Sequence, residues 1–400
     1  MDAAVAARRR ERQAWRVVLA SFAALCLLLV GTPTAIGYYR DAALSPRSAR
    51  LDVIKGTVLY LANGSRQEVN AHDDLELREG DQVRIMPDSL ALVFLHDGSN
   101  VQLYPDSSLV IEQSRASAYN ANRSETVLTQ RSGRSRIEVS PTSTDARWFE
   151  VHTPTATAQL REGSYAVHVL GANGESTLDL SVRRGSASVT AGERTVEVLP
   201  RERTTARAGE PPTAPQPALR DFVANGDFAG ALDSWQAGNR AVEDGNPGDI
   251  SLITQDGRNI VRFLRRESSN HAETYIHQNL DRDVADFQQL TIALHLKVIQ
   301  QSLSGGGWLG SEYPVTVRLR YRDVNGNETT WVQGFFIQNG EGRPTTHGQL
   351  VPKDTWVSFS ASLFDPNRVY PRPAHLLWIE IEASGWQYES MVTGVQILGE

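Results

Sequence analysis

Two histidines in the C-terminal half of this 400-residue chain, His271 and His277, are the first candidates for chemistry. Their even separation would place both side chains on the same face of a β-strand. Six residues of strand span about 20 Å, so the two imidazoles cannot bind one metal ion directly. We therefore expect no metal site shared by this pair.

Two glutamates, Glu380 and Glu382, also share one face of a predicted strand. Apolar residues alternate with them, which predicts that the carboxylates lie on a solvated face. The sequence has no Gly-x-Ser-x-Gly elbow, no His-Glu-x-x-His pair and no phosphate-binding glycine loop. We expect a protein that is not an enzyme. The alternative is glycan hydrolysis, which would need two carboxylates at a defined separation.

Charge and cysteine content narrow the classes of partner. Lys and Arg number 40 against 47 Asp and Glu, a net charge of −7, which argues against nucleic acid as a partner. The single cysteine, Cys26, excludes an internal disulfide and a cysteine-based zinc site. A lipid-modified Cys26 is the alternative, but it would need a Leu–small–small pattern, and Leu25 stands directly before the cysteine.

The N-terminal segment predicts a membrane helix over residues 15–38. Residues 17–31 carry no charge, and a helix over 15–38 would be about 34–36 Å long, enough to cross roughly 30 Å of hydrocarbon. Trp15 and Tyr38 suit the two membrane interfaces. Five arginines put the N-terminal stub, 1–14, in the cytoplasm and the bulk of the chain outside the cell membrane: Arg8, Arg9, Arg10, Arg12 and Arg16. A cleaved secretory signal is the alternative.

Period-two alternation dominates the rest of the chain and predicts an all-β protein. A polar tether, 39–50, precedes a first β domain, 51–209, which is either a sandwich or a β-solenoid. The proline-rich stretch 210–220 is predicted to be a linker, because proline cannot donate to a strand ladder. The second β domain, 221–400, contains six of the eight tryptophans and a strong hairpin signal at Asn325-Gly326.

The first β domain resembles the FecR-like domain of bacterial envelope proteins. The similarity is spread over stretches that occur in the same order along the chain: 53–58, 79–84, 89–99, 101–105, 149–156, 160–165 and 184–189. The resemblance implies a scaffold or a signal-receiving module. Proteins known for this domain signal to a sigma factor through a folded cytoplasmic domain, but fourteen residues cannot bury a core. Signalling through contacts of the membrane helix is therefore the alternative function.

The second β domain resembles galactose-binding-like jelly rolls and carbohydrate-binding modules. The resemblance rests on Val223–Phe228, Leu232–Trp235 and the final strand-like run 392–398. It implies a sandwich that binds a glycan or a protein partner, and the loop tryptophans Trp308 and Trp386 are the candidate ligand contacts. Such sandwiches often hold calcium, for which Asp227 is the candidate ligand, although no cofactor is required by the sequence. We thus predict a non-enzymatic, membrane-anchored envelope protein that presents a ligand-binding jelly roll.

Overall fold

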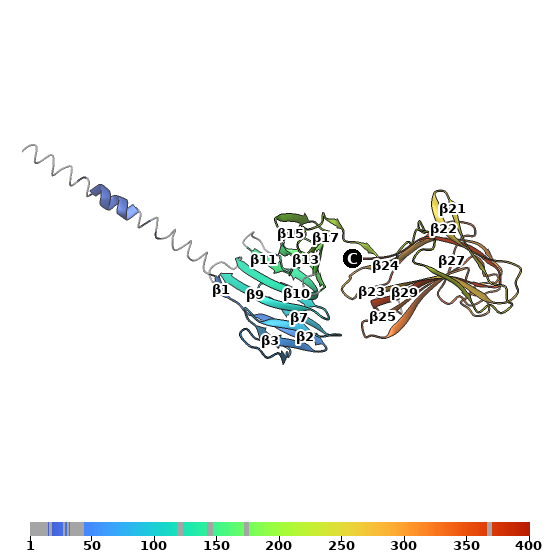
Figure 1. Cartoon of the computed structure of the whole chain (residues 1–400), viewed down its shortest axis with the longest axis horizontal. Helices are drawn as coiled ribbons and strands as arrows, with labels where there is room; N and C mark the ends of the chain where they lie inside the picture. Colours follow the sequence, from blue (N-terminus) through green and yellow to red (C-terminus); the bar gives the residue numbers. More distant parts are fainter. Residues whose placement is uncertain are drawn as a thin grey trace, which may run out of the picture. The chain divides into compact units, whose positions relative to one another are not determined.

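The computed structural model describes a chain built almost entirely of β-strands (Figure 1). It describes residues 15, 18–26, 29, 32, 44–117, 123–141, 147–171, 176–365 and 370–400. The strands form two compact units, and the boundary between them in the sequence lies between Ala218 and Leu219. Each unit is described by itself.

Only part of the predicted membrane helix 15–38 lies among the described residues. Those positions are helical: Trp15, 18–26, Leu29 and Thr32. Within the described part of the chain, no helix is both long enough and apolar enough to cross a membrane. The remaining positions of 15–38, together with the stub 1–14 and residues 39–43, lie outside the described residues.

Unit 1 consists of two β-sheets that share one long strand. In spatial order, the first sheet contains β4 (Val69–Asn70), β3 (Val58–Leu61), β6 (Gln82–Ile85), β9 (Ser108–Ser117), β10 (Ser124–Val139), β11 (Arg147–His152), β12 (Thr157–Leu160), β15 (Ala187–Ala191) and β16 (Arg194–Val198), with β1 (Leu44–Pro46) also on β9. The second contains β5 (Leu75–Leu77), β2 (Ala49–Lys55), β7 (Leu90–Phe94), β8 (Asn100–Leu103), β10, β13 (Gly163–Leu170), β14 (Thr177–Arg184), β17 (Glu202–Arg207) and β18 (Gln216–Pro217). Apart from the first strand of each sheet, the strands follow one another across both sheets in the order of the chain. Unit 1 therefore combines the two sheets of a sandwich with the sequential order of a solenoid.

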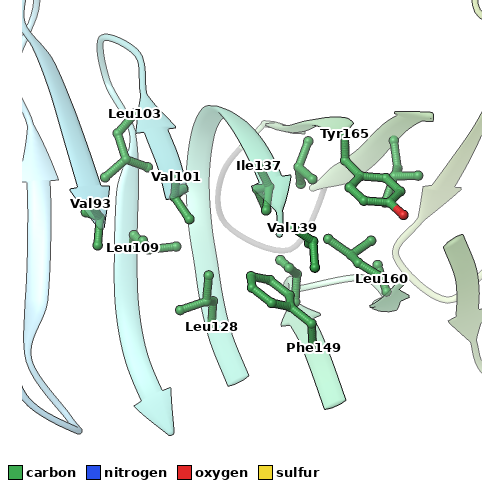
Figure 2. Close-up of a cluster of buried hydrophobic side chains, with 14 of the residues drawn as sticks. Val93, Val101, Leu103, Leu109, Leu128, Ile137, Val139, Phe149, Leu160 and Tyr165 are labelled. Atoms are coloured by element: carbon green, nitrogen blue, oxygen red, sulfur yellow. The ribbon is translucent and has the colours of Figure 1, made fainter. Parts of the chain in front are cut away.

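The inward side chains of these strands form the core of unit 1 (Figure 2). Alternate residues are buried, as β7 shows with Ala91 and Val93, both 0% exposed. Tyr165 is the largest polar member, and its hydroxyl oxygen lies 2.8 and 2.9 Å from the carbonyl oxygens of Arg161 and Ser186, which share its one proton. Period-two alternation thus explains the fold, because each strand offers one apolar face to the opposite sheet.

Strand β10 passes from one sheet to the other through a bend at residues 130–133. The register of its pairing with β9 shifts between Gln130 and Ser132. The buried Gln130 side chain donates to the carbonyl of Gly133 at 2.7 Å and accepts from the Ser135 hydroxyl at 2.6 Å, so the bend keeps its polar groups paired. Gly133 has φ of +76°, and a Cβ there would lie 2.4 Å from the Cα of Ser107. The bend therefore requires glycine.

Parts of the two segments predicted as tether and linker are strands of the sheets. Leu44–Pro46 pairs with β9, and β2 begins at Ala49, so the described part of 39–50 belongs to the fold. In the proline-rich segment 210–220, Gln216–Pro217 pairs with β17. Proline is tolerated there because β18 is an edge strand whose outer side needs no donor.

Unit 2 is an antiparallel sandwich of two six-stranded sheets. Sheet C runs in the order β21 (Asp249–Gln255), β22 (Arg258–Arg265), β30 (Tyr388–Gly399), β24 (Leu290–Gln301) and β28 (Val357–Ser362), with β19 (Arg220–Asp221) also paired to β30. Sheet D runs in the order β20 (Gln236–Arg240), β23 (Ala272–Asp283), β29 (Pro373–Gly385), β25 (Val315–Asp323), β26 (Glu328–Phe336) and β27 (Gly348–Leu350), of which only the described pair β26–β27 is parallel. One hydrophobic cluster fills the space between the sheets. The all-β prediction is confirmed.

A buried arginine fixes the loops at one end of the sandwich. The side chain of Arg265, at the end of β22, is 0% exposed and pairs with Asp244 at 2.7 Å. Its other nitrogens donate to four backbone carbonyls in three loops: Asn246, Asn270, Gly385 and Trp386. Five acceptors around one guanidinium compensate the loss of its hydration.

Replacing Gly133 by alanine should destabilise unit 1 more than the same change at Gly192. Both glycines have positive φ, +76° and +60°, so each variant loses about 1–2 kcal/mol to backbone strain. Only at Gly133 does the new Cβ meet backbone, which adds about 1–3 kcal/mol of overpacking, since nothing lies within 4 Å of a Cβ at Gly192. Hydrogen exchange of β10 and β15 amides in the full chain measures both losses. Equal losses would show that the close approach is unimportant.

Arg265→Met should lower the free energy of unfolding of unit 2 by about 3–5 kcal/mol, because it leaves a carboxylate and several carbonyls unpaired. The neighbouring Arg266 is the matched control. Its side chain is 60% exposed and makes an ion pair with Glu389 at 3.3 Å, so Arg266→Met should cost less than about 1 kcal/mol. Urea unfolding followed by tryptophan fluorescence reports mainly on unit 2, which contains six of the eight tryptophans. Similar midpoints for the two variants would refute the role given to Arg265.

Candidate functional site

The side of sheet D that points away from the core carries polar and aromatic residues from four adjacent strands. We call it the D face and define it by Arg240 of β20, Tyr275 and His277 of β23, Arg318 and Arg320 of β25, and Trp378, Glu380 and Glu382 of β29. The strand register brings them together: Tyr275 lies opposite Glu382, and His277 opposite Glu380. On the other side of β29, Glu380 lies opposite Arg318, and Trp378 opposite Arg320. The alternating residues Ile379 and Ile381 point into the core.

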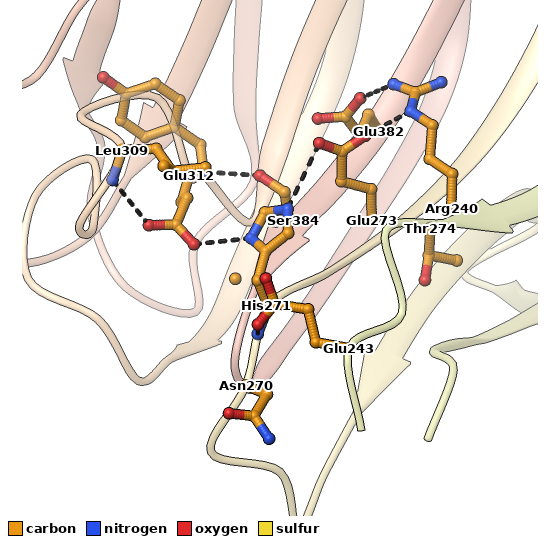
Figure 3. Close-up of polar contacts among 12 residues, drawn as sticks. Arg240, Glu243, Asn270, His271, Glu273, Thr274, Leu309, Glu312, Glu382 and Ser384 are labelled. Carbon is orange, nitrogen blue, oxygen red and sulfur yellow. Dashed lines mark hydrogen bonds and ion pairs between the residues drawn. The ribbon is translucent and has the colours of Figure 1, made fainter. Parts of the chain in front are cut away.

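Arg240 is the centre of an ion-pair cluster on this face (Figure 3). Its guanidinium binds both carboxylate oxygens of Glu380, at 2.8 and 3.0 Å, and also pairs with Glu273 and Glu382. Arg318 pairs with Glu382 from the opposite side at 3.2 Å. Three carboxylates from two strands are thus ion-paired with two arginines from two others.

Two of the three acidic members of the cluster are buried although they lie on the outer side of the sheet. Glu380 is 5% exposed and Glu382 is 0% exposed. Burial raises the pKa of Glu382, and the charges of Arg318 and Arg240 oppose that rise. Burial would also raise the pKa of Glu273, but hydrogen bonds from His271 and Arg240 outweigh it and lower the pKa to about 2. The hydrogen bond to Glu380 raises the pKa of Arg240, so the central cation stays charged.

Two aromatic side chains lie on the D face in fixed orientations. Tyr275 leans across Gly238, where a Cβ would lie only 2.6 Å from the tyrosine oxygen, so glycine makes room for the ring. The Arg240 guanidinium lies 4.7 Å from the centre of the Tyr275 ring. Trp378 packs against the His277 ring with their centres 5.2 Å apart. Both aromatic residues are half-buried, which leaves part of each ring accessible.

A loop between β24 and β25 is attached to the end of the D face through His271 (Figure 3). The carboxylate of Glu312 accepts from the backbone N–H of Leu309 at 3.0 Å and lies 2.7 Å from Nδ1 of His271. The other imidazole nitrogen of His271 lies 3.4 Å from Glu273. Hydrogen bonds to Glu273 and Glu312 raise the pKa of His271 to about 9, so the imidazole is a cation at neutral pH. This cation joins the loop to the cluster around Arg240.

None of the three site residues predicted from the sequence belongs to the ion-pair cluster around Arg240. Trp308 is 64% exposed in the β24–β25 loop, and the Arg343 guanidinium stacks on it at 3.8 Å. Trp386 is half-buried, and its carbonyl accepts a hydrogen bond from the buried arginine at the end of β22. Asp227 is exposed and accepts from the N–H of Ala229 at 3.3 Å. In the described residues, no three His, Cys, Asp or Glu side chains are arranged to hold a metal ion.

One prediction about this region is wrong. Glu380 and Glu382 do not lie on a solvated face, because arginines from neighbouring strands cover and neutralise them. His271 and His277 take part in the same polar network rather than in a metal site, since His277 lies 3.5 Å from Glu380. The sequence analysis did not identify Arg240, Arg318, Tyr275 and Trp378. The available signal was the alternation of charged and apolar residues in 317–320 and 378–382.

Comparison with known proteins identifies one family in the chain. A family model described as "FecR protein" matches residues 81–188. Among curated proteins there is no significant match.

Solved structures with similarity to the chain have low scores. A protein from Parabacteroides distasonis assigned as an anti-sigma factor shares 17% identity, covers 34% of this chain and has a TM-score of 0.28; the chain spans 59% of its length. The family 11 carbohydrate-binding module of a Clostridium thermocellum cellulase shares 10% identity over 45% of this chain and 95% of its own, with a TM-score of 0.29. The family 30 module of another cellulase from that organism shares 11% identity over 41% and 90%, with a TM-score of 0.23. The match to the FecR family model over residues 81–188, which lie within unit 1, is therefore the comparison that bears on the family of this chain.

Proposed function

We propose that this chain is a non-enzymatic protein of the bacterial cell envelope in which the FecR domain is a scaffold and unit 2 binds a glycan on the D face. The FecR match over 81–188 supports the scaffold. The D face supports the binding site, and the apolar run within 15–38 supports attachment to the cell membrane. In this arrangement the N-terminus is cytoplasmic and both β units lie outside the membrane.

The observation that carries the glycan proposal is the combination of accessible rings and fixed charges on the D face. A pyranose has an apolar C–H surface, which packs on aromatic rings such as Tyr275 and Trp378. Its hydroxyls need donors and acceptors, and the side chains of His277, Arg318 and Arg320 are 20, 30 and 34% exposed. Because ion pairs hold these groups in place, little conformational entropy would be lost on binding.

The same geometry argues for binding rather than hydrolysis. A glycosidase needs two carboxyl groups that flank the scissile bond. Glu382 is completely buried, and Glu380 is bound through both oxygens by Arg240, so neither is presented to a sugar. The face therefore offers contacts to a glycan without an acid and a nucleophile for its cleavage.

Trp378→Ala should weaken glycan binding at least about tenfold, because it removes a central aromatic contact. The matched control is Trp356→Ala, because Trp356 precedes the edge strand β28 of sheet C. The glycan affinity of this variant should stay within about twofold of that of the unchanged chain. Affinity electrophoresis of the full-length chain against neutral glucans, xylan and galactans and against acidic alginate and polygalacturonate measures both. Equal retention of the two variants, or no retention of the unchanged chain by any polysaccharide, would overturn the D-face proposal.

The membrane proposal makes a separate prediction. The full-length chain should remain in the membrane pellet after alkaline carbonate extraction, and protease added to spheroplasts should digest both β units. In a control variant, an unrelated cleavable export signal replaces residues 1–43. This variant should appear in the soluble fraction after carbonate extraction. Release of the full-length chain by carbonate would contradict anchoring by 15–38, and protection from protease would contradict the orientation.

A further inference from the structure

The loop between β24 and β25 presents two large apolar side chains to solvent at its tip. Trp308 is 64% exposed and Leu309 is 67% exposed, the highest values among the large hydrophobic residues described in unit 2. Exposing an indole to water is unfavourable, since burial of a large apolar side chain gains about 1.5–3 kcal/mol. A tryptophan at such a tip is therefore a candidate contact residue.

Backbone hydrogen bonds hold this loop in one conformation. Gly305 and Gly306 donate to the carbonyls of Gln338 and Pro344 at 2.8 and 3.0 Å, which ties the loop to the segment after β26. The glycines are required by close packing: a Cβ at Gly306 would lie 2.4 Å from the carbonyl of Gly310. The tip is thus preorganised, and a ligand that contacts it loses little freedom of the protein chain.

The loop is anchored at the end of the D face. Glu312 pairs with His271, which directly precedes β23 and also contacts Glu273 of the ion cluster. The next residue, Tyr313, donates its N–H to the hydroxyl of Ser384 at 3.1 Å, and its ring occupies the space over Gly334 on β26. Contacts with His271 just before β23, with Ser384 of β29 and with Gly334 of β26 therefore keep the loop beside the outer side of sheet D.

The Trp308 ring has one covered side and one open side. The Arg343 guanidinium lies 3.8 Å from the ring centre, and Glu341 holds that guanidinium at 3.0 Å. With the ring 64% exposed, the opposite side is available to a flat apolar surface. An arginine stacked on one side fixes the orientation of the indole, as a stacking platform requires.

We propose that Trp308 is a second stacking site, which takes the part of an elongated glycan that extends beyond the D face, and that the Glu312–His271 ion pair positions it. This inference rests on the proposed glycan binding of unit 2. It implies a chain of several sugars as the ligand. From His271 to Tyr275 the strand covers about 13 Å, so one sugar ring cannot reach from Trp308 to the centre of the face.

Fragments of different length separate this inference from the proposed function. The probes are disaccharide to hexasaccharide fragments of whichever polysaccharide the full-length chain retains in affinity electrophoresis. Trp308→Ala should leave the affinity for the disaccharide unchanged and weaken the hexasaccharide about tenfold, equivalent to about 1.4 kcal/mol. Leu309 lies next to Trp308 and is similarly exposed, so Leu309→Ala is the control. It should bind the disaccharide and the hexasaccharide like the unchanged chain. Trp378→Ala should weaken both.

Two outcomes are distinct. If the unchanged chain binds no fragment and no polysaccharide, the proposed function fails. If it binds but Trp308→Ala keeps the full preference for the hexasaccharide, the stacking site is overturned and the tip has a different partner, a protein or a lipid surface. A direct readout is oxidation of tryptophans by N-bromosuccinimide with mass spectrometry: the hexasaccharide should protect Trp308, and the disaccharide should not.

Glu312→Gln tests the positioning role. It should increase hydrogen exchange at Leu309 and weaken the hexasaccharide alone, as Trp308→Ala does. Increased exchange with unchanged hexasaccharide affinity would show that the ion pair holds the loop but does not position the tryptophan.

Alkaline pH tests the same ion pair without mutation. The pKa of His271 is raised to about 9 from 6.5, so the stabilisation is complete below pH 6.5 and is lost as pH rises through about 9. The groups around the imidazole are Glu273 and Glu312, with Arg240 beyond Glu273 and Glu243 at its backbone N–H. Hexasaccharide affinity should fall between pH 8 and 10, and disaccharide affinity should not. Parallel falls would contradict the role of His271.

Discussion

Placing the Glu382 carboxylate on the outer side of sheet D and yet out of contact with water is the constraint on which unit 2 depends. A buried charge of this kind is costly by several kcal/mol unless it is paired and hydrogen-bonded. Its partners come from β20 and β25, on opposite sides of β29, so the two arginines hold separate strands in one register. A slip of one residue would turn isoleucines outward and glutamates into the core. The same ion pairs orient the rings and guanidiniums from which we infer binding.

The two units solve the problem of joining two sheets in different ways. In unit 1, β10 belongs to both sheets, and a bulge, a buried glutamine and Gly133 let it turn between them. In unit 2, the described sheets are joined by their core and by loops, among them the β24–β25 loop and the loops that Arg265 binds. Binding residues often lie on loops that a rigid scaffold positions, and the exposed Trp308 of unit 2 lies on such a loop.

Strand content was predictable from the sequence because alternation is a local property. The predicted Asn325-Gly326 turn does connect β25 to β26. The candidate site was not predictable to the same degree. Glu380 and Glu382 read as solvated because nothing near them in the sequence neutralises them; Arg240 is about 140 residues away along the chain. Strand order decides such contacts, and period-two alternation contains no information about it. The exposed position of Trp308, by contrast, could be predicted, because three glycines directly before it indicate a loop.

The position of β30 has a consequence for how the chain acquires its structure. In unit 1 most pairings connect strands that are close in sequence, so this unit can form progressively as the chain is made. In unit 2, β30 lies in the middle of sheet C, between β22 and β24, and also holds β19. Until residues 388–399 are available, sheet C lacks its central strand and apolar surface stays uncovered. Unit 1 would then fold first, while unit 2 stays incomplete and prone to aggregation until β30 has been made.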